Sequence, residues 1–291
     1  MGCFKKSNKR QLLNFSLKHL ILLTLVVFTY TIQSQNDTLT GGKRIWHDLK
    51  YDGVSIFKGV GNAYSQPLRW QKDDFITAGS LIAGSGLLYL ADNEAQHYFS
   101  KQGEDAPQLL QDFGWYFGSP QNFFMVSAGV YGFGLLTDNE KVRYTGVLII
   151  SSAVASGFVQ TISKTAFGRA RPSSGDRNDF KPFSSESGFH SFPSGHSVLS
   201  FTMAHAIAKQ FDNFWVKAGI YAVGSIAPIS RLWKNAHWLS DVGFGMAFSV
   251  IVVDGIDNFM KRTNRYEFEK PKQISWQLKM GYGTVGVVGT F

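Results

Sequence analysis

From residue 75 onward, apolar residues gather in six runs separated by polar connections. The length and spacing of the apolar positions predict that each run is a helix. The predicted helices cover about residues 75–91, 121–137, 142–163, 197–209, 214–230 and 238–258. The sequence has no internal repeat, so we expect an all-α fold built on a single six-helix bundle.

The segments around these runs have different patterns. Residues 35–74 are polar, with glycines and aromatic residues in no clear period, and they are predicted to form an extended segment that wraps the core. Residues 92–120 are predicted to form a polar connection that can hold a short helix. A long loop rich in Ser, Gly, Pro and charge covers 165–195, and a loop of that length is usually functional. Residues 274–291 alternate as a strand does, which predicts a short β hairpin at the edge of the helical core or an extended tail.

The first residues have the layout of a secretory signal peptide. Five basic residues precede the apolar run Leu20–Ile32, and the polar stretch Gln33–Asn36 follows it. We expect residues 1–34 to be removed by cleavage near Ser34. The run is too short for a confident membrane span, although an uncleaved anchor is the alternative.

Loss of this leader changes what the composition indicates. The full chain has a net charge of +8, and five of its 29 Lys and Arg residues lie before residue 35, where there is no acidic residue. The remaining excess of +3 gives little support to nucleic-acid binding. The only cysteine, Cys3, leaves with the leader, so no disulfide is expected.

Three short blocks carry the candidate chemistry. They are Lys164 to Arg171-Pro172, then Pro193-Ser194-Gly195-His196, then Ser230-Arg231 followed by His237 and Asp241. Lys164, Arg171 and Arg231 suit the negative charge that spreads over the oxygens of a phosphoryl group during transfer. Ser194 and Gly195 precede an apolar run, so they are expected at a helix start, where free backbone N–H groups favour an anion.

The two histidines suit different tasks. His237 and Asp241 are four residues apart, so on a helix they share one face. Asp241 can then accept the proton on one ring nitrogen of His237 and leave the other nitrogen as a nucleophile. His196, with a pKa suited to neutral pH, would protonate the leaving oxygen as general acid.

The blocks Lys-x6-Arg-Pro, Pro-Ser-Gly-His and Ser-Arg-x5-His-x3-Asp resemble the signature of the type 2 phosphatidic acid phosphatase (PAP2) superfamily. That superfamily also holds bacterial class A acid phosphatases and vanadium haloperoxidases. Every signature position matches, and the resemblance predicts a phosphatase domain at about 75–260 with a tail at 261–291. It implies that His237 carries a phosphohistidine, that Asp241 orients His237 and that His196 is the acid. The residues implied to bind phosphate oxygens are Lys164, Arg171, Ser194, Gly195 and Arg231, and no metal or other cofactor is implied.

The resemblance leaves three classes of function open. The first is hydrolysis of phosphate monoesters or of lipid phosphates and diphosphates. The second is a vanadium-dependent haloperoxidase in which His237 holds vanadate, although the chain is short for such an enzyme. The third is an inactive binding module. A metal site on His190, His196, His237 and Asp241 is disfavoured because the nearby cations would repel a divalent ion. Neither the substrate nor the oligomeric state follows from the sequence.

The location of the protein is the hardest question. Runs 75–91 and 144–163 contain no charge and could nearly span a membrane, but Ala218–Ser230 and Val242–Val253 are only thirteen and twelve residues long. A mean hydropathy of −0.08 suits a secreted globule with an apolar helical core more than a polytopic membrane protein. In a six-helix lipid phosphatase the motif ends of helices three to six share one side of the membrane, so the first helix must begin on the opposite side. An outward-facing site would then place the chain before residue 75 in the cytoplasm, whereas the signal segment places residues 35–74 outside. We therefore expect a periplasmic or membrane-peripheral protein with a water-soluble helical core, the alternative being an integral inner-membrane protein.

Overall fold

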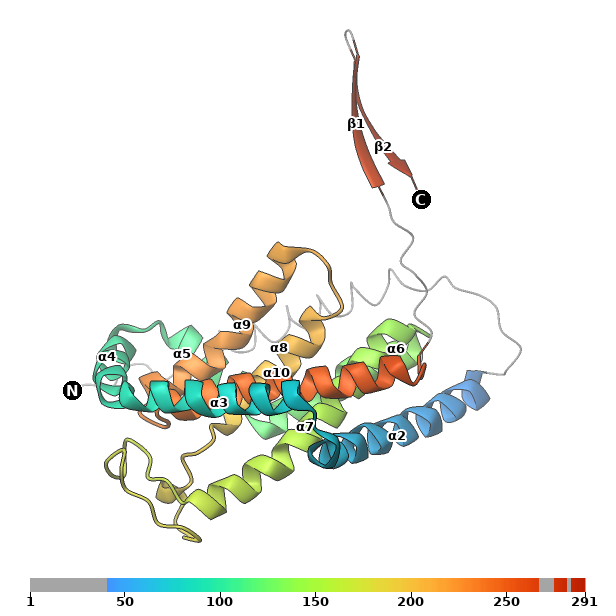
Figure 1. Cartoon of the computed structure of the whole chain (residues 1–291). Coiled ribbons are helices and arrows are strands. Elements are labelled where there is room, and N and C mark those ends of the chain that lie inside the picture. The colour runs from blue at the N-terminus through green and yellow to red at the C-terminus, as the bar shows by residue number, and fades with distance from the viewer. Residues whose placement is uncertain (1–40, 267–274, 282–283, 291) are drawn as a thin grey trace, which may run out of the picture.

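The computed structural model describes residues 41–266, 275–281 and 284–290 (Figure 1). This part of the chain forms nine α-helices, two short 3-10 helices and one pair of strands. The α-helices are α2 (Gly41–Ser65), α3 (Lys72–Leu90), α4 (Asp92–Asp105), α5 (Gln108–Phe117), α6 (Pro120–Leu136), α7 (Glu140–Phe167), α8 (Gly195–Ala208), α9 (Phe214–Trp233) and α10 (Leu239–Arg262). The 3-10 helices are η1 (Gln66–Arg69) and η2 (Ser187–Phe189). The predicted signal peptide, residues 1–34, lies outside the described residues.

The six predicted helices correspond to α3, α6, α7, α8, α9 and α10, and their predicted ends differ from the observed ones by no more than about one helical turn. The all-α fold class is confirmed. The six-helix count is too low for the described residues, because the predicted polar connection at 92–120 folds largely as α4 and α5.

The prediction of an extended segment at 35–74 is wrong for residues 41–65, which form α2. The buried positions of α2 are Asp48, Asp52, Ser55, Gly59 and Asn62. They recur every three or four residues, as one face of a helix does, but none carries an apolar side chain. A search for apolar periodicity therefore misses this face. The large apolar residues Trp46, Val54 and Phe57 are exposed instead.

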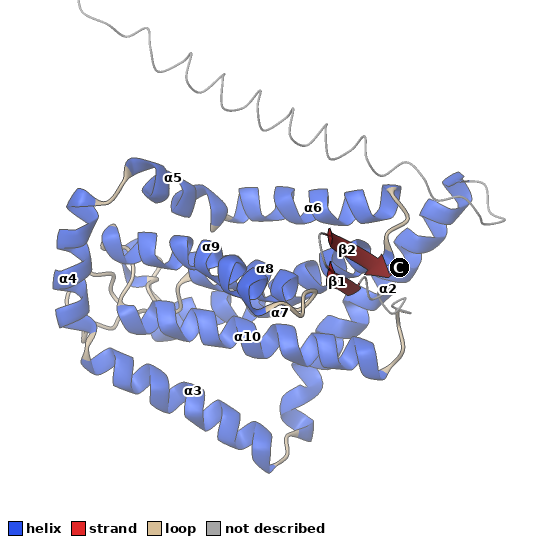
Figure 2. Cartoon of the chain, turned by 90° about the horizontal axis from the view of Figure 1, so that it is seen from above, coloured by secondary structure: helices blue, strands red, loops and turns tan. Residues whose placement is uncertain are grey.

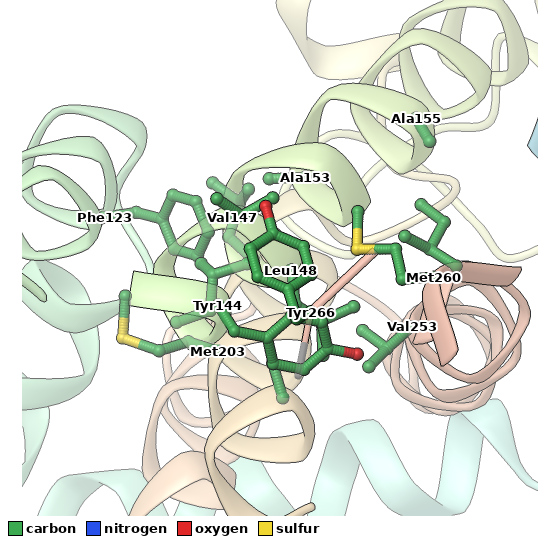
Figure 3. Close-up of a cluster of buried hydrophobic side chains, with 14 residues drawn as sticks. Phe123, Tyr144, Val147, Leu148, Ala153, Ala155, Met203, Val253, Met260 and Tyr266 are labelled. Carbon is green, nitrogen blue, oxygen red and sulfur yellow. The ribbon is translucent and has the colours of Figure 1, made fainter. Parts of the chain in front are cut away.

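The helical body is organised around α7, which packs against α2, α6, α8 and α10. Seen from above, α3 lies along one side of the body, α5 and α6 lie along the other, and α4 closes one end (Figure 2). In the core, Tyr144, Val147 and Leu148 of α7 meet side chains of α6, α8 and α10 (Figure 3). Close packing from four helices fixes the axis of α7, and so the position of its last turn.

The two ends of α7 have clear local causes. The side-chain oxygen of Asn139 accepts a hydrogen bond from the N–H of Val142 at 3.0 Å and caps the first turn. The helix ends at Gly168, whose φ of 54° is left-handed. A Cβ there would lie 1.9 Å from the carbonyl oxygen of Lys181, so glycine is required by conformation and by space. This stop leaves Lys164 in the last turn, directly before the long loop 168–194.

The apolar helices face outward more than the sequence predicts. No side chain of α3 is buried, and Phe75, Ile82 and Leu87 are each more than half exposed. Two helices, α7 and α10, are long and apolar enough to cross a membrane, and the bent pair α3–α4 would make a third. This display is typical of a membrane-associated protein. The expectation that the apolar runs are buried in a water-soluble core is therefore wrong for α3.

The C-terminal alternation corresponds to β1 (Ser275–Gly281) and β2 (Thr284–Thr290), which pair antiparallel. Figure 1 shows this hairpin projecting away from the helices. The predicted place of the hairpin, at the edge of the helical core, is therefore wrong.

Candidate active site

The three sequence blocks converge at the end of the body where α5 and the α7–α8 loop lie (Figure 1). A cavity of about 520 Å³ opens there. Its lining includes the predicted site residues Lys164, Arg171, Gly195, His196, Arg231 and His237. These residues come from the end of α7, the long loop, the start of α8, the end of α9 and the turn before α10, so only the fold brings them together. Ser194 and Asp241 are fully buried behind the cavity wall.

Two of the cations are oriented by backbone carbonyls. The Nζ of Lys164 donates to the carbonyl oxygen of His190 at 2.9 Å. The Nη1 of Arg171 donates to the carbonyl of Ala236 at 2.8 Å, and its Nη2 donates to that of His190 at 3.3 Å. No carboxylate lines the cavity within the described residues, so this charge remains available to an anion. Burial lowers the pKa of Arg171 without removing its charge at neutral pH.

The third cation, Arg231, is only 2% exposed. Its Nε and Nη2 donate to the hydroxyl of Ser230 at 3.2 and 3.0 Å, and its guanidinium stacks 4.7 Å from the ring centre of Trp115. Burial, together with the charge of Arg171, lowers the pKa of Arg231 to about 10. The guanidinium is therefore charged, in contact with the ring of Trp115 and part of the cavity wall.

The start of α8 lies beside these cations as expected. Ser194 is the residue before α8, and its own N–H donates to the carbonyl of Asp241 at 3.1 Å. Its hydroxyl accepts from Ser197 at 2.8 Å. Gly195 lines the cavity, and a Cβ there would lie 2.7 Å from Nε2 of Gln160. A larger residue at this position would displace the end of the Gln160 side chain, which also lines the cavity.

His237 and Asp241 meet in a different way from the prediction. They do not share a helix face, because α10 begins at Leu239 and His237 precedes it. Asp241 instead lies in the first turn and reaches back to the helix start, where its Oδ2 accepts from the N–H of Trp238 at 2.9 Å. Nδ1 of His237 lies 3.7 Å from the same oxygen, which is an ion-pair distance and longer than a hydrogen bond. Nε2 faces the cavity, 3.3 Å from Nη1 of Arg171.

Asp241 is held from both sides by residues that the motif search passes over. Its Oδ1 accepts from Nη1 of Arg169 at 2.6 Å, and its Oδ2 accepts from the hydroxyl of Ser191 at 2.5 Å. The signal for Arg169 was present in the sequence, since it stands two residues before Arg171. The position of the carboxylate is thus fixed independently of the histidine.

His196 does not titrate near neutrality, which corrects the expectation from sequence. Burial, followed by the charge of Arg231, lowers its pKa to about 3. Burial likewise lowers the pKa of His237 to about 4, although the carboxylate of Asp241 opposes the shift. Both rings are neutral at pH 7 with this arrangement of charges. Nε2 of His196 is buried without a hydrogen-bond partner among the described residues.

Further residues of the cavity wall are not in any motif. They include Trp115 and Pro120 near the α5–α6 connection, Gln160 of α7, and Lys234 after α9. Trp115 also packs on the ring of His196, with ring centres 5.7 Å apart. Only spatial proximity reveals these residues, because each lies outside the three blocks.

The metal alternative has no matching cluster in the described residues, where no group of three or more His, Cys, Asp or Glu side chains could hold an ion. His190 directs Nε2 to the carbonyl oxygen of Ser184, 2.8 Å away. Its carbonyl group, rather than its ring, is the part that binds Lys164 and Arg171.

Comparison with known proteins gives a consistent result. A sequence profile of the PAP2 superfamily matches residues 145–264. Lipid A 1-phosphatase of Rhizobium johnstonii is 32% identical, in an alignment covering 65% of this chain and 79% of that protein. Lipid A 1-phosphatase of Rhizobium etli is also 32% identical, over 62% of this chain and 81% of that protein. A solved structure, the first transmembrane PAP2 type phosphatidylglycerolphosphate phosphatase from Bacillus subtilis, is 20% identical with a TM-score of 0.44, over 65% of this chain and 98% of that one. The relatives and the matching motif blocks confirm the resemblance: the chain belongs to the PAP2 superfamily and is a phosphoric ester hydrolase.

Proposed function

We propose that this protein is a membrane-embedded lipid phosphatase that removes a phosphate group through a phosphohistidine at His237. The single observation that carries the proposal is the cavity, in which three buried or half-buried cations and two neutral histidines face one space. That combination stabilises a phosphoryl group electrostatically and supplies a nucleophile and a proton donor.

In the first half of the proposed reaction, Nε2 of His237 attacks phosphorus. The N–P bond forms as the bond from phosphorus to the ester oxygen breaks, and the proton of His196 passes to that oxygen. Asp241 stabilises the positive charge that develops on the ring of His237. Because His196 is neutral in the empty cavity, it must gain its proton with the substrate, and the phosphate dianion supplies the negative charge that favours this protonation.

In the second half, His196 is neutral and acts as base. It takes a proton from a water molecule whose oxygen attacks phosphorus, the N–P bond breaks, and inorganic phosphate leaves. Lys164, Arg171 and Arg231 stay in contact with the equatorial oxygens through both halves. The proton taken from water then leaves His196 with the phosphate, which balances the proton gained with the substrate, and the ring of His237 is neutral again once the N–P bond has broken. The enzyme therefore ends in its starting state.

A lipid is the substrate class that the surroundings favour. The cations lie at the end of a helical body that exposes apolar side chains on α3 and α9, among them Ile82, Leu87 and Trp215. The relatives named lipid A 1-phosphatase act on a phosphorylated lipid, as their name says. We therefore propose a lipid phosphate monoester, with a lipid A 1-phosphate as the first candidate.

The covalent step can be tested directly. Acid-labile ³²P should appear on wild-type protein quenched during turnover of labelled substrate, and His237→Ala should lose both the label and turnover. His97→Ala is the matched control, since His97 is exposed and away from the cavity, and it should keep both. Full turnover by wild-type protein without any labelled intermediate would exclude the phosphohistidine.

The substrate class needs a second experiment. Phosphate release should be compared for water-soluble monoesters, phosphatidic acid, phosphatidylglycerophosphate, polyprenyl diphosphate and lipid A, each with and without detergent. The proposal predicts the highest kcat/KM for a lipid monoester. Preference for a soluble monoester would contradict the lipid assignment, and halide oxidation by vanadate-loaded protein without phosphatase activity would replace the whole proposal by the haloperoxidase alternative.

A further inference from the structure

A buried arginine that touches no part of the cavity joins two carboxylates behind the site. The Nη1 of Arg169 donates to Oδ1 of Asp241 at 2.6 Å, and its Nη2 donates to Oδ2 of Asp92 at 2.6 Å. Arg169 is 2% exposed, and both carboxylate residues are fully buried. One guanidinium fork therefore links Asp241, which faces His237, to a second carboxylate on another helix.

Hydrogen bonds from Ser240 and two aromatic rings surround the contact between Arg169 and Asp92. The hydroxyl of Ser240 accepts from Arg169 at 2.8 Å and donates to Asp92 at 2.7 Å, and the N–H of Ser240 donates to the other oxygen of Asp92 at 2.9 Å. The rings of Tyr89 and Trp238 lie 4.8 and 5.4 Å from the guanidinium carbon of Arg169. Every polar group of the cluster is paired, and the aromatic rings restrict the guanidinium to one orientation.

Asp92 reaches this position through a bend in the chain. It is the first residue of α4, directly after the 66° turn between α3 and α4. The same bend is tied to the α7–α8 loop, because Nη1 of Arg177 donates to the carbonyls of Tyr89 and Leu90 at 3.2 and 3.1 Å. The bend between α3, whose apolar side chains face outward, and α4 is thus hydrogen-bonded to the loop that carries Arg171.

We infer that Asp92 and Arg169 form a positioning pair that fixes the carboxylate of Asp241 and sets how strongly it acts on His237. Neither residue touches the reacting phosphate, so neither is catalytic. The inference rests on the proposed function, in which His237 is the nucleophile.

The electrostatic argument has a definite sign. The positive charge of Arg169 by itself would offset the stabilisation that Asp241 gives to a positive ring of His237. The negative charge of Asp92 offsets the charge of Arg169, so the effect of Asp241 on His237 is kept. Removing the charge of Asp92 should therefore lower the proton affinity of His237, and removing the charge of Arg169 should raise it. A merely structural ion pair would give losses of stability with no such opposite effect.

The other charged groups near His237 do not reverse this sign. They are Lys164 on α7, Arg171 on the loop, His196 on α8, Arg231 on α9 and Asp241 on α10. Substitutions at Asp92 or Arg169 leave the side chains of Lys164, Arg171, His196 and Arg231 in place, and Asp241 is the group through which the pair acts. The measured shift then reports the positioning pair alone.

The test compares Asp92→Asn with Arg169→Met in detergent-solubilised full-length protein. Both variants should lose about tenfold to a hundredfold in kcat with little change in KM, as expected when a group behind a catalytic residue is altered. The acidic limb of the kcat/KM profile should move to lower pH in Asp92→Asn and to higher pH in Arg169→Met. Shifts in the same direction, or wild-type kcat in folded Asp92→Asn, would overturn the inference.

Asp52→Asn is the matched control. Asp52 is also a fully buried carboxylate, 3.4 Å from Nε of Arg143, but it lies on α2 outside the cavity wall. It should lose thermal stability as Asp92→Asn does and keep the wild-type pH profile. Should Arg169→Met fail to fold, Arg169→Lys takes its place: it keeps the charge but not the fork, so kcat should fall while the acidic limb stays. Unchanged kcat in Arg169→Lys would contradict the role of the fork.

The outcomes separate this inference from the proposed function. Wild-type protein that forms no phosphohistidine would refute the proposed function whatever the variants do. A wild-type phosphohistidine together with wild-type behaviour of Asp92→Asn would refute only the positioning pair.

Discussion

His196 and His237 lie in one cavity, yet different charged and aromatic groups surround the two rings. His237 has a buried carboxylate 3.7 Å from Nδ1, which stabilises a positive ring, while His196 has Arg231 nearby and packs on Trp115. A bound dianion changes this balance most for His196, because that ring has no carboxylate of its own among the described contacts. Under the proposed mechanism, the bound substrate therefore supplies the negative charge that allows His196 to act as the acid.

This asymmetry predicts proton uptake on anion binding. The pKa of His196 is about 3 in the empty cavity, and the negative charge of a bound dianion should raise this pKa. The affinity for sulfate should therefore increase as pH falls from 7 to 5. Sulfate stays a dianion over this range, so the effect belongs to the protein. Calorimetry in two buffers of different ionisation enthalpy measures the proton taken up. His196→Gln should reduce the uptake, and equal uptake by wild type and variant would assign it to another group.

The lowered histidine pKa values also predict how stability depends on pH. The unfolded chain binds protons to His196 and His237 near the usual value of 6.5, whereas the folded chain binds them only near 3 and 4. Between about pH 6.5 and pH 3 the unfolded state thus binds more protons. The stabilisation from these two groups is therefore present above that window and is lost as pH falls through it. The melting temperature of His237→Ala should fall less between pH 6.5 and pH 4 than that of wild type, and equal falls would contradict the lowered pKa of His237.

A glycine outside the motifs should matter as much as a motif residue. A Cβ at Gly118, after α5, would lie 2.8 Å from Cβ and Cδ2 of His196. Gly118→Ala should therefore move the ring of His196 and lower kcat, with the fold retained. Gly129→Ala on α6 is the control, since nothing lies within 4 Å of its added Cβ. Equal activity of the two variants would show that His196 tolerates displacement.

Among the elements, α2 shows most clearly how a helix can escape a hydropathy search. Its inner face carries Asp48 and Asp52, which meet Arg143 of α7, and the hydroxyl of Tyr266 donates to Asp52 at 2.8 Å. These ion pairs and hydrogen bonds lie beside partly buried contacts of Ile56, Val60 and Ala63 with the core, and the fully buried positions that recur with a period of 3.6 are polar or glycine. The outer face mixes apolar side chains such as Trp46, Val54 and Phe57 with Lys43, Lys50 and Lys58.

The two faces of α2 can be distinguished by two glycines. A Cβ at Gly59 would meet Met260 and Ile256 of α10 at 3.1 and 3.2 Å, whereas Gly61 has nothing within 4 Å. Gly59→Leu should destabilise the protein by about 1–3 kcal/mol through overpacking, and Gly61→Leu should not destabilise it. Thermal melting in detergent compares them, and equal melting temperatures would contradict the placement of α2 against α10.

For the whole molecule, the apolar helices and the position of the site make a prediction about topology. Figures 1 and 2 show α2 beginning at the end of the body away from α4 and α5, where the cavity lies. If α7 and α10 span the membrane, Lys43 and the exposed loop residue Ser185 lie on opposite sides.

Cysteine labelling tests this arrangement in a Cys3→Ser background. Lys43→Cys and Ser185→Cys should react with a membrane-impermeant maleimide from opposite sides of sealed vesicles, and the protein should stay in carbonate-washed membranes. Labelling of both from the same side, or recovery of the protein by osmotic shock without detergent, would restore the water-soluble alternative. The N-terminus of the recovered protein, near Gln35 or at Met1, decides whether the predicted signal peptide is cleaved.

The sequence by itself determined the superfamily, six of the helices and the motif residues of the candidate site. Helices such as α7 and α8 follow from long apolar runs with local caps, and motif residues such as Lys164 and His237 are recognisable because their spacing along the chain is part of the signature. Both are local properties, which a sequence contains directly.

Only the tertiary structure decided what surrounds those residues and which way the helices face. The polar inner face of α2, the contact of Asp92 with Arg169 and the desolvation of His196 all depend on residues far apart in the sequence. Hydropathy also cannot distinguish an apolar side chain that is buried from one that faces outward. The apolar helix α3, which has no buried residue, demonstrates this. Burial and long-range pairing are properties of packing, so they exist only once the chain has folded.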